Sequence, residues 1–184
     1  MKILCFLLIL SVTAINARLF EGQCRPLIAP VVDPFNYKLY LGKWYEILWY
    51  DDEYETFDEC IVFTYDPTST DAFDMTLDLQ EANHDFAHQQ YKGHGVLSNP
   101  GELSTTFGSG IPSRVNHYVL ATDYEHYAFV WDCFNVNSTH YNERMWYFDR
   151  EANPSQRPSE VENLLTYFDP QYIRTTYHGK ECLY

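Results

Sequence analysis

Apolar and polar residues alternate in short runs along most of the chain, and turn-forming residues separate the runs. Tyr, Phe, Trp, Val, Ile and Thr dominate these runs, and such residues are favoured in strands. A series of short strands broken by turns predicts an all-β sandwich or barrel. The eight runs are Trp44 to Tyr50, Cys60 to Tyr65, Phe73 to Leu79, Gln90 to Leu97, Leu103 to Phe107, Val115 to Ala121, Tyr127 to Val136 and Arg144 to Phe148.

The connections between the runs are short. Residues 66–69, 99–101 and 122–125 are rich in Asp, Asn, Pro, Gly and Thr, which favour tight turns. Parallel neighbours would need helical crossovers between the strands. The pattern therefore predicts antiparallel strands joined by hairpins.

Helical periodicity comes late in the chain, after Pro158. Ser159 and Glu162 have the spacing of a capping box at a helix start. Val161, Leu164, Leu165 and Phe168 share one face of the expected helix. We expect one amphipathic helix after the strands.

The N-terminal segment has the pattern of a secretory signal peptide. Lys2 precedes an apolar run from Ile3 to Leu10, and a small-residue cleavage site follows at Ala17. We expect cleavage after Ala17, a single domain over residues 18–184, and a secreted, extracellular protein. The apolar run is too short for a membrane span.

The chain is acidic, with 26 Asp and Glu against 12 Lys and Arg and a net charge of -14. Such a charge disfavours nucleic acid and anionic lipid surfaces as partners. Cleavage of the signal peptide would remove Cys5 and leave four cysteines. An even number of cysteines in a secreted chain predicts two disulfides. Three pairings are open for Cys24, Cys60, Cys133 and Cys182.

Three separated motifs resemble those of the lipocalin family. Gly42, Lys43 and Trp44 match its Gly-x-Trp at the first barrel strand, and Thr122, Asp123 and Tyr124 match its Thr-Asp-Tyr turn. Arg150 matches the lone arginine before the family's helix. The run from Tyr118 to Cys133 is most similar to the group of insect bilin-binding proteins, insecticyanins and apolipoprotein D.

The resemblance implies an eight-stranded antiparallel up-and-down barrel with one C-terminal helix packed outside. It implies disulfides from Cys24 to Cys133 and from Cys60 to Cys182. It also implies that Trp44 plugs the closed end of the barrel and that Arg150 lies across its indole.

The family resemblance further implies a cavity for one small hydrophobic ligand, held without a covalent bond. Biliverdin is the leading expectation, and fatty acids, sterols, retinoids and carotenoids are the others. Strand alternation from Trp44, the expected disulfide and, for Trp146, the family resemblance suggest the wall residues. They are Leu48, Tyr50, Val119, Val130, Phe134 and Trp146. Asp132 is expected to face the cavity, Arg144 to lie near its mouth, and Glu46 to be a hydrogen-bonded structural group at the floor.

Asn137, Ser138 and Thr139 form an N-glycosylation sequon between the last two expected strands. His84 and His88 have the spacing of helical zinc ligands, but the polar connection between strands that holds them predicts no helix, so no metal site is expected. A lipocalin-type prostaglandin isomerase would need a free cysteine inside the barrel. All four cysteines of the mature chain are expected to form disulfides, so this activity is not expected.

We therefore expect no catalytic residues. The alternative to a carrier is a secreted interaction protein or scavenger, which would bind a receptor, a protease or small amines. A homo-oligomer or a cell-surface receptor stays open as a partner.

Overall fold

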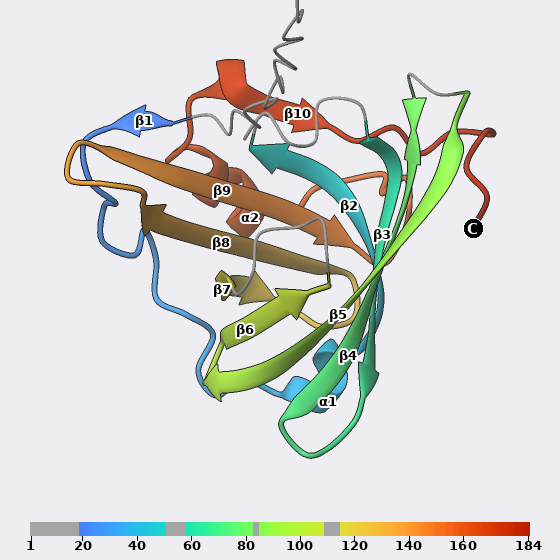
Figure 1. Ribbon diagram of the computed structural model, residues 1–184, viewed down its shortest axis with the longest axis horizontal. Coiled ribbons are helices and arrows are strands. Elements are labelled where there is room, and N and C mark those ends of the chain that lie inside the picture. The colour runs from blue at the N-terminus through green and yellow to red at the C-terminus, as the bar shows by residue number, and fades with distance from the viewer. Residues whose placement is uncertain (1–18, 51–57, 83–84, 109–114) are drawn as a thin grey trace, which may run out of the picture.

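The computed structural model describes residues 19–50, 58–82, 85–108 and 115–184. Figure 1 shows one large sheet that curls round on itself, each long strand lying beside the next in the chain. The strands alternate as the sequence pattern predicts, because each wall has one face toward the interior. The long strands are β2 (Gly42–Tyr50), β3 (Asp58–Pro67), β4 (Ala72–Glu81), β5 (Ala87–Asn99), β6 (Glu102–Phe107), β7 (Val115–Thr122), β8 (Tyr127–Asn135) and β9 (His140–Asp149).

Antiparallel pairing between β2 and β9 closes the sheet into a barrel. Tyr45 lies opposite Asp149, and Trp49 lies opposite Trp146. Eight strands from β2 to β9 form the closed wall, which confirms the predicted fold class. Two short strands extend it, β1 (Phe20–Glu21) on β9 and β10 (Ile173–Thr175) on β2.

A short helix that the sequence pattern did not predict, α1 (Tyr37–Tyr40), lies at one end of the barrel (Figure 1). Both of its tyrosines are buried, and the Trp44 indole Nε1 donates to the Tyr40 carbonyl at 2.8 Å. Four residues are too few to show a helical period. Together with Trp44, this helix forms the closed end of the barrel.

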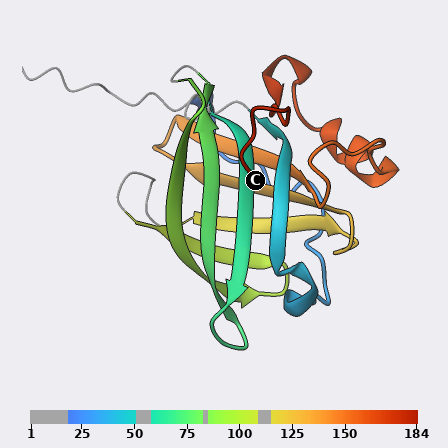
Figure 2. The ribbon, with the colours of Figure 1, turned by 90° about the vertical axis from the view of Figure 1, so that its right-hand side faces the viewer.

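Helix α2 (Ser159–Leu165) lies outside the barrel wall, beside the C-terminal segment (Figure 2). Val161, Leu164 and Leu165 are buried, so the predicted apolar face is confirmed. The predicted capping box is wrong, because Pro158 occupies the N-cap position and no side chain caps the helix. A 3-10 turn, Pro170–Tyr172, follows and leads into β10.

Buried side chains form two main clusters on opposite sides of the wall. The inner cluster is inside the barrel and contains Tyr37, Tyr40, Trp44, Trp49, Tyr65, Phe73, Met75, Leu103, Val119, Ala128, Val130, Trp146 and Phe148. The outer cluster lies between the wall and α2 and contains Leu48, Tyr50, Leu120, Ala121, Tyr127, Phe129, Trp131, Met145, Tyr147, Val161, Leu164, Leu165 and Phe168. Cluster membership therefore tells which face of the wall a side chain occupies.

Two disulfides fasten the ends of the described chain to the wall. Cys24 is bonded to Cys133 in β8, and Cys60 in β3 is bonded to Cys182. This is the pairing that the family resemblance implies. The expected signal peptide, residues 1–17, lies outside the described residues. Within the described ranges, no helix has the length and apolar character of a membrane span.

Candidate ligand-binding site

Trp44 forms the floor of the barrel interior and is fully buried. The Arg150 guanidinium carbon lies 3.5 Å from its ring centroid, a cation–π contact. The same guanidinium donates hydrogen bonds to backbone carbonyls of Leu39, Tyr40, Leu41, Lys43 and Tyr124 at 2.6–3.3 Å. Burial lowers the pKa of Arg150. Gly42, before Trp44, has a φ of 94° that favours glycine.

The Thr122-Asp123-Tyr124 motif builds the turn between β7 and β8. The Thr122 hydroxyl accepts from the Tyr124 amide and donates to the Tyr127 carbonyl, at 2.9 and 2.5 Å. Asp123 Oδ1 accepts from the backbone amides of His126 and Tyr127. Although burial opposes it, these hydrogen bonds lower the pKa of Asp123. The motif thus fixes the turn against which Arg150 packs.

The prediction that Leu48 and Tyr50 line the cavity is wrong. Between Glu46 and Leu48 the register of β2 against β9 shifts, so that Ile47 is an extra residue in the strand. Beyond this bulge the two faces exchange. Leu48 and Tyr50 join the outer cluster, and Trp49 points inward to the inner cluster.

Three of the predicted wall residues do lie on the inner face. Val119, Val130 and Trp146 are buried members of the inner cluster. Phe134 follows Val130 and Asp132 on the same face of β8, but it is 44% exposed near the end of the strand. The β8–β9 loop follows, at the end of the barrel opposite α1 (Figure 1). Phe134 therefore belongs to the rim.

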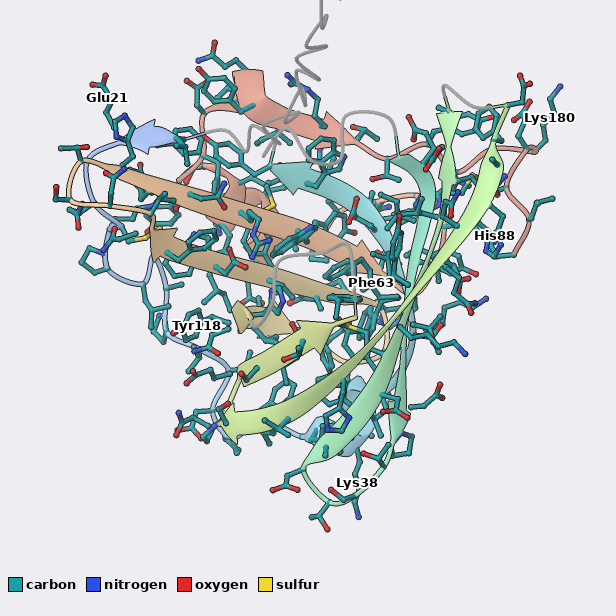
Figure 3. The ribbon with its side chains drawn as sticks, in the orientation of Figure 1. Glu21, Lys38, Phe63, His88, Tyr118 and Lys180 are labelled. Atoms are coloured by element: carbon teal, nitrogen blue, oxygen red, sulfur yellow. A yellow bond between two sulfur atoms is a disulfide. The ribbon has the colours of Figure 1, made fainter. Side chains whose placement is uncertain are left out.

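Another apolar group extends the inner wall on β3 and β4. Ile61, Leu77 and Leu79 are buried there, and Phe63, Tyr91 and Phe107 pack against them while staying partly exposed. Figure 3 shows Phe63 in the middle of the barrel, whereas Lys38 and Lys180 point away from it. Most of the described wall is thus aliphatic or aromatic.

Glycines of β5 make room for rings on the inner face. Gly95 lies opposite Phe73, and a Cβ at Gly95 would come within 2.2 Å of the Phe73 ring. Gly93 lies opposite Phe107, whose ring would be 3.1 Å from such a Cβ. The two missing side chains let the phenylalanines lie flat against the wall.

Polar side chains interrupt the apolar wall at the inner polar cluster, which consists of Thr105, His117, Asp132 and Arg144. Arg144 Nε and Nη2 donate to the two Asp132 carboxylate oxygens at 3.0 and 2.5 Å. His117 Nδ1 lies 3.4 Å from Asp132 Oδ2, and its Nε2 lies 2.9 Å from the Thr105 hydroxyl. The inward positions expected for Asp132 and Arg144 agree with this geometry, whereas His117 and Thr105 are not among the residues predicted from the sequence.

Burial sets the protonation states of the inner polar cluster. Burial, with the charge of Arg144 beside it, lowers the pKa of His117 to about 3, so the imidazole is neutral at pH 7. Burial also raises the pKa of Asp132, while the ion pair with Arg144 opposes that rise. The cluster is therefore a charged pair flanked by a neutral histidine.

Glu46 lies at the floor and is fully buried. Its Oε1 accepts from the Thr176 hydroxyl at 2.8 Å, and its backbone carbonyl lies 2.6 Å from His178 Nε2. Burial lowers the pKa of His178, so its ring stays neutral and can donate this bond. These partners fit the expected structural role of Glu46.

The remaining candidates lie on the outside. Asn137 is exposed in the β8–β9 loop, and its Oδ1 accepts from the Thr139 and His140 amides. His84 lies outside the described residues, and His88 pairs with Asp78 on the outer wall at 3.0 Å. In the described ranges, no three His, Cys, Asp or Glu side chains gather as a metal site would require.

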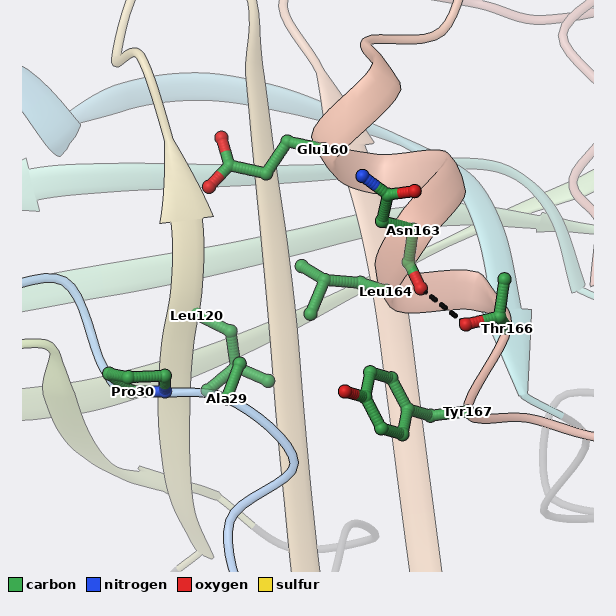
Figure 4. A pocket seen from close by; sticks show the side chains of 8 residues that line it. All are labelled: Ala29, Pro30, Leu120, Glu160, Asn163, Leu164, Thr166 and Tyr167. Carbon is green, nitrogen blue, oxygen red and sulfur yellow. Dashed lines mark hydrogen bonds between the residues drawn. The ribbon is translucent and has the colours of Figure 1, made fainter.

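A second hollow, of about 520 Å³, lies between α2, β7 and the N-terminal segment (Figure 4). Leu120 and Leu164 form its apolar base, and Glu160, Asn163 and Tyr167 rim it. It lies outside the barrel and has none of the enclosed aromatic character of the inner wall. We therefore take the interior of the barrel as the candidate site.

Comparison with known proteins agrees with this architecture. The lipocalin / cytosolic fatty-acid binding protein family matches residues 41–166. Apolipoprotein D of Bos taurus is 31% identical over 146 residues, covering 78% of this chain and 73% of the relative. The Lazarillo protein of Schistocerca americana is 28% identical over 167 residues, covering 82% and 74%.

Two solved structures share the fold. Insecticyanin from Manduca sexta matches with a TM-score of 0.75 at 18% identity, covering 91% of this chain and 93% of that chain. Apocrustacyanin C1 matches with a TM-score of 0.73 at 20% identity, covering 89% and 93%. Because the family match spans more than half of the chain and agrees with the closed barrel, the chain belongs to the lipocalin family.

Proposed function

We propose that this protein binds one small, mainly apolar molecule inside its barrel and carries it without changing it chemically. The observation that carries the proposal is the inner wall, where Phe63, Tyr91 and Phe107 stay partly exposed although they face the interior. Apolar walls with a few fixed polar groups are typical of small-molecule sites. The family's members bind small hydrophobic ligands, in agreement with this proposal.

Biliverdin is the ligand class we propose first, on the resemblance to bilin-binding lipocalins. Flat inner-wall rings such as Trp49, Trp146 and Phe63 suit a conjugated, planar molecule, because aromatic faces stack on one another. Sterols, retinoids, carotenoids and fatty acids are the other members of the panel to be tested.

We also propose that the protein works outside the cell after removal of residues 1–17. Two disulfides support this location, since such bonds persist in oxidising compartments. An N-linked sugar at the exposed Asn137 would stand at the rim beside Phe134 and leave the interior open.

The test uses matched substitutions on the two faces of the wall. Phe107→Glu places a carboxylate on the inner face, and Val96→Glu places the same group on β5 at a position 38% exposed outside. Titration with biliverdin and retinol should quench tryptophan fluorescence, since Trp49 and Trp146 face inward. We expect Phe107→Glu to weaken binding at least about tenfold, because the ligand would meet a buried charge. Val96→Glu should bind like the unchanged protein.

Equal loss of affinity in both variants would place the ligand elsewhere than the barrel. A native protein that carries no apolar compound by mass spectrometry, and binds no member of the panel, would contradict the carrier function. That result would favour an interaction protein.

A further inference from the structure

The inner polar cluster lies on the wall just above Trp146. His117, Asp132 and Arg144 sit on the neighbouring strands β7, β8 and β9, with Asp132 directly opposite Arg144 in the ladder. The His117 ring contacts the Trp146 indole at 5.3 Å between centroids. Both Asp132 and Thr105 are almost fully buried. A ligand that fills the apolar interior would therefore have one end against this cluster.

The guanidinium of Arg144 is held from two sides. Two of its nitrogens donate to Asp132, the bidentate geometry that fixes an arginine most firmly. Its plane lies over Trp146 and Phe134, with distances of 5.2 and 5.6 Å to the ring centroids. The positive charge is thus already matched by a carboxylate before any ligand enters.

Three other cations of the described chain are engaged elsewhere. Arg150 lies beneath Trp44, and Lys43 stacks outside on Tyr45 and Tyr184. Arg25 pairs with Glu143 at 2.7 Å, and Glu143 accepts from the Trp131 indole, which belongs to the outer cluster. A ligand carboxylate at the cluster would be close to Asp132 and would have to compete with it for Arg144.

We propose that the inner polar cluster selects ligands whose end against the cluster is polar but uncharged, such as a hydroxyl, carbonyl or lactam. Such groups exchange hydrogen bonds with the Thr105 hydroxyl, the His117 imidazole and the Arg144–Asp132 pair without adding a charge. A carboxylate end is disfavoured there, because Asp132 already matches the charge of Arg144 and a further buried charge costs more than its hydrogen bonds return. Biliverdin fits with a lactam end at the cluster and its two carboxylates directed away from it. This inference rests on the proposed function.

The test compares ligands that differ only at one end: retinol with retinoic acid, and a long-chain alcohol with the fatty acid of equal length. Affinities are measured at pH 7.5 by tryptophan quenching and by competition. We expect each alcohol to bind at least about tenfold more tightly than its acid, the ratio that 1.4 kcal/mol corresponds to.

Asp132→Asn should reverse this preference. The substitution keeps the size of the side chain but removes the charge that matches Arg144, so a ligand carboxylate becomes the natural counterion. The alcohol-to-acid affinity ratio should fall by at least about 100-fold, from tenfold for the alcohol to tenfold for the acid. Asp78→Asn is the matched control, because Asp78 pairs with His88 and Gln90 on the outer wall. It should leave the ratio unchanged.

The outcomes separate the two proposals. If the unchanged protein binds the acids as tightly as the alcohols, or Asp132→Asn folds and keeps the ratio, the inference on the inner polar cluster is overturned while the carrier function stands. If neither alcohol nor acid binds, and no other member of the panel binds either, the carrier function itself fails. Circular dichroism verifies that each variant is folded, and the comparison on the unchanged protein decides the matter without any variant.

Discussion

At the scale of single residues, Arg150 combines two roles at the floor of the barrel. Its guanidinium covers the Trp44 ring and at the same time binds carbonyls of the α1 segment, β2 and the β7–β8 turn. A planar fork with several donors can do this, whereas an ammonium is a single point charge. Arg150, at the end of β9, thus joins the α1–β2 segment to the β7–β8 turn, which is distant from it in sequence.

Arg150→Lys should therefore destabilise the fold although it keeps the charge. We expect a loss of roughly 2 kcal/mol in the free energy of unfolding, because several hydrogen bonds to backbone carbonyls are lost together with the contact to the Trp44 ring. Urea denaturation followed by fluorescence measures it.

Arg157→Lys is the matched control for this substitution. Arg157 makes an ion pair with Glu162 at 2.9 Å in which both side chains are more than one third exposed. Exposed pairs contribute little, about 0.5 kcal/mol or less. Equal effects of the two substitutions would contradict the role given to Arg150.

At the scale of elements, alternation predicts where the strands lie but not which face each residue takes. Each of the eight predicted runs coincides with one of the strands β2 to β9, and only Val136 lies beyond its strand, because half-buried strands must alternate. In β2 the faces exchange at Ile47, where the strand's first half pairs with β3 and its second half with β10. β10 is 123 residues further along the chain than Tyr50, counted to Ile173, so local pattern could not predict the bulge.

Local sequence pattern could predict only part of the inner polar cluster. Asp132 and Arg144 could be placed inward from the expected disulfide and the resemblance. His117 and Thr105 join them only because β6, β7 and β8 lie side by side. A signal was present in the sequence, since His117 shares its parity with Val119, but a lone histidine on a strand is rarely singled out.

A disulfide reinforces the hydrogen bonds that hold the C-terminal segment beside β2 and β3. The Cys60–Cys182 disulfide closes a loop with a sequence separation of 122 residues. We expect Cys60→Ala with Cys182→Ala to lower stability by up to about 4 kcal/mol. Hydrogen exchange should rise most in residues 173–184. The double variant at Cys24 and Cys133 is the control, and it should loosen the N-terminal segment instead; the same exchange pattern in both would contradict this assignment.

At the scale of the whole molecule, an acidic chain encloses a barrel whose interior contains a neutral histidine. The pKa of His117 falls from 6.5 to about 3 on burial. Between these pH values the imidazole is protonated in the unfolded chain but neutral in the folded protein. The stability linked to this group is complete above pH 6.5 and is lost as the pH falls from 6.5 toward 3.

His117→Gln should remove that loss. When the pH falls from 7.5 to 5, the free energy of unfolding of the variant should decrease by about 2 kcal/mol less than that of the unchanged protein. Urea denaturation at both pH values measures it. His126 gives the opposite sign, because its bond to Asp123 raises its pKa and adds stability that is lost as the pH rises. His126→Gln should thus weaken the protein mainly at the lower pH, and parallel curves for the three proteins would refute the linkage.

The glycines of the inner wall limit which side chains can change the shape of the cavity. No side chain fits at Gly95 while Phe73 keeps its ring there, since a Cβ would overlap it at 2.2 Å. An alanine at position 95 therefore requires the Phe73 ring to move away or to be replaced by a smaller side chain. Changes at these two positions are coupled, so a new cavity shape on this part of the wall involves both residues.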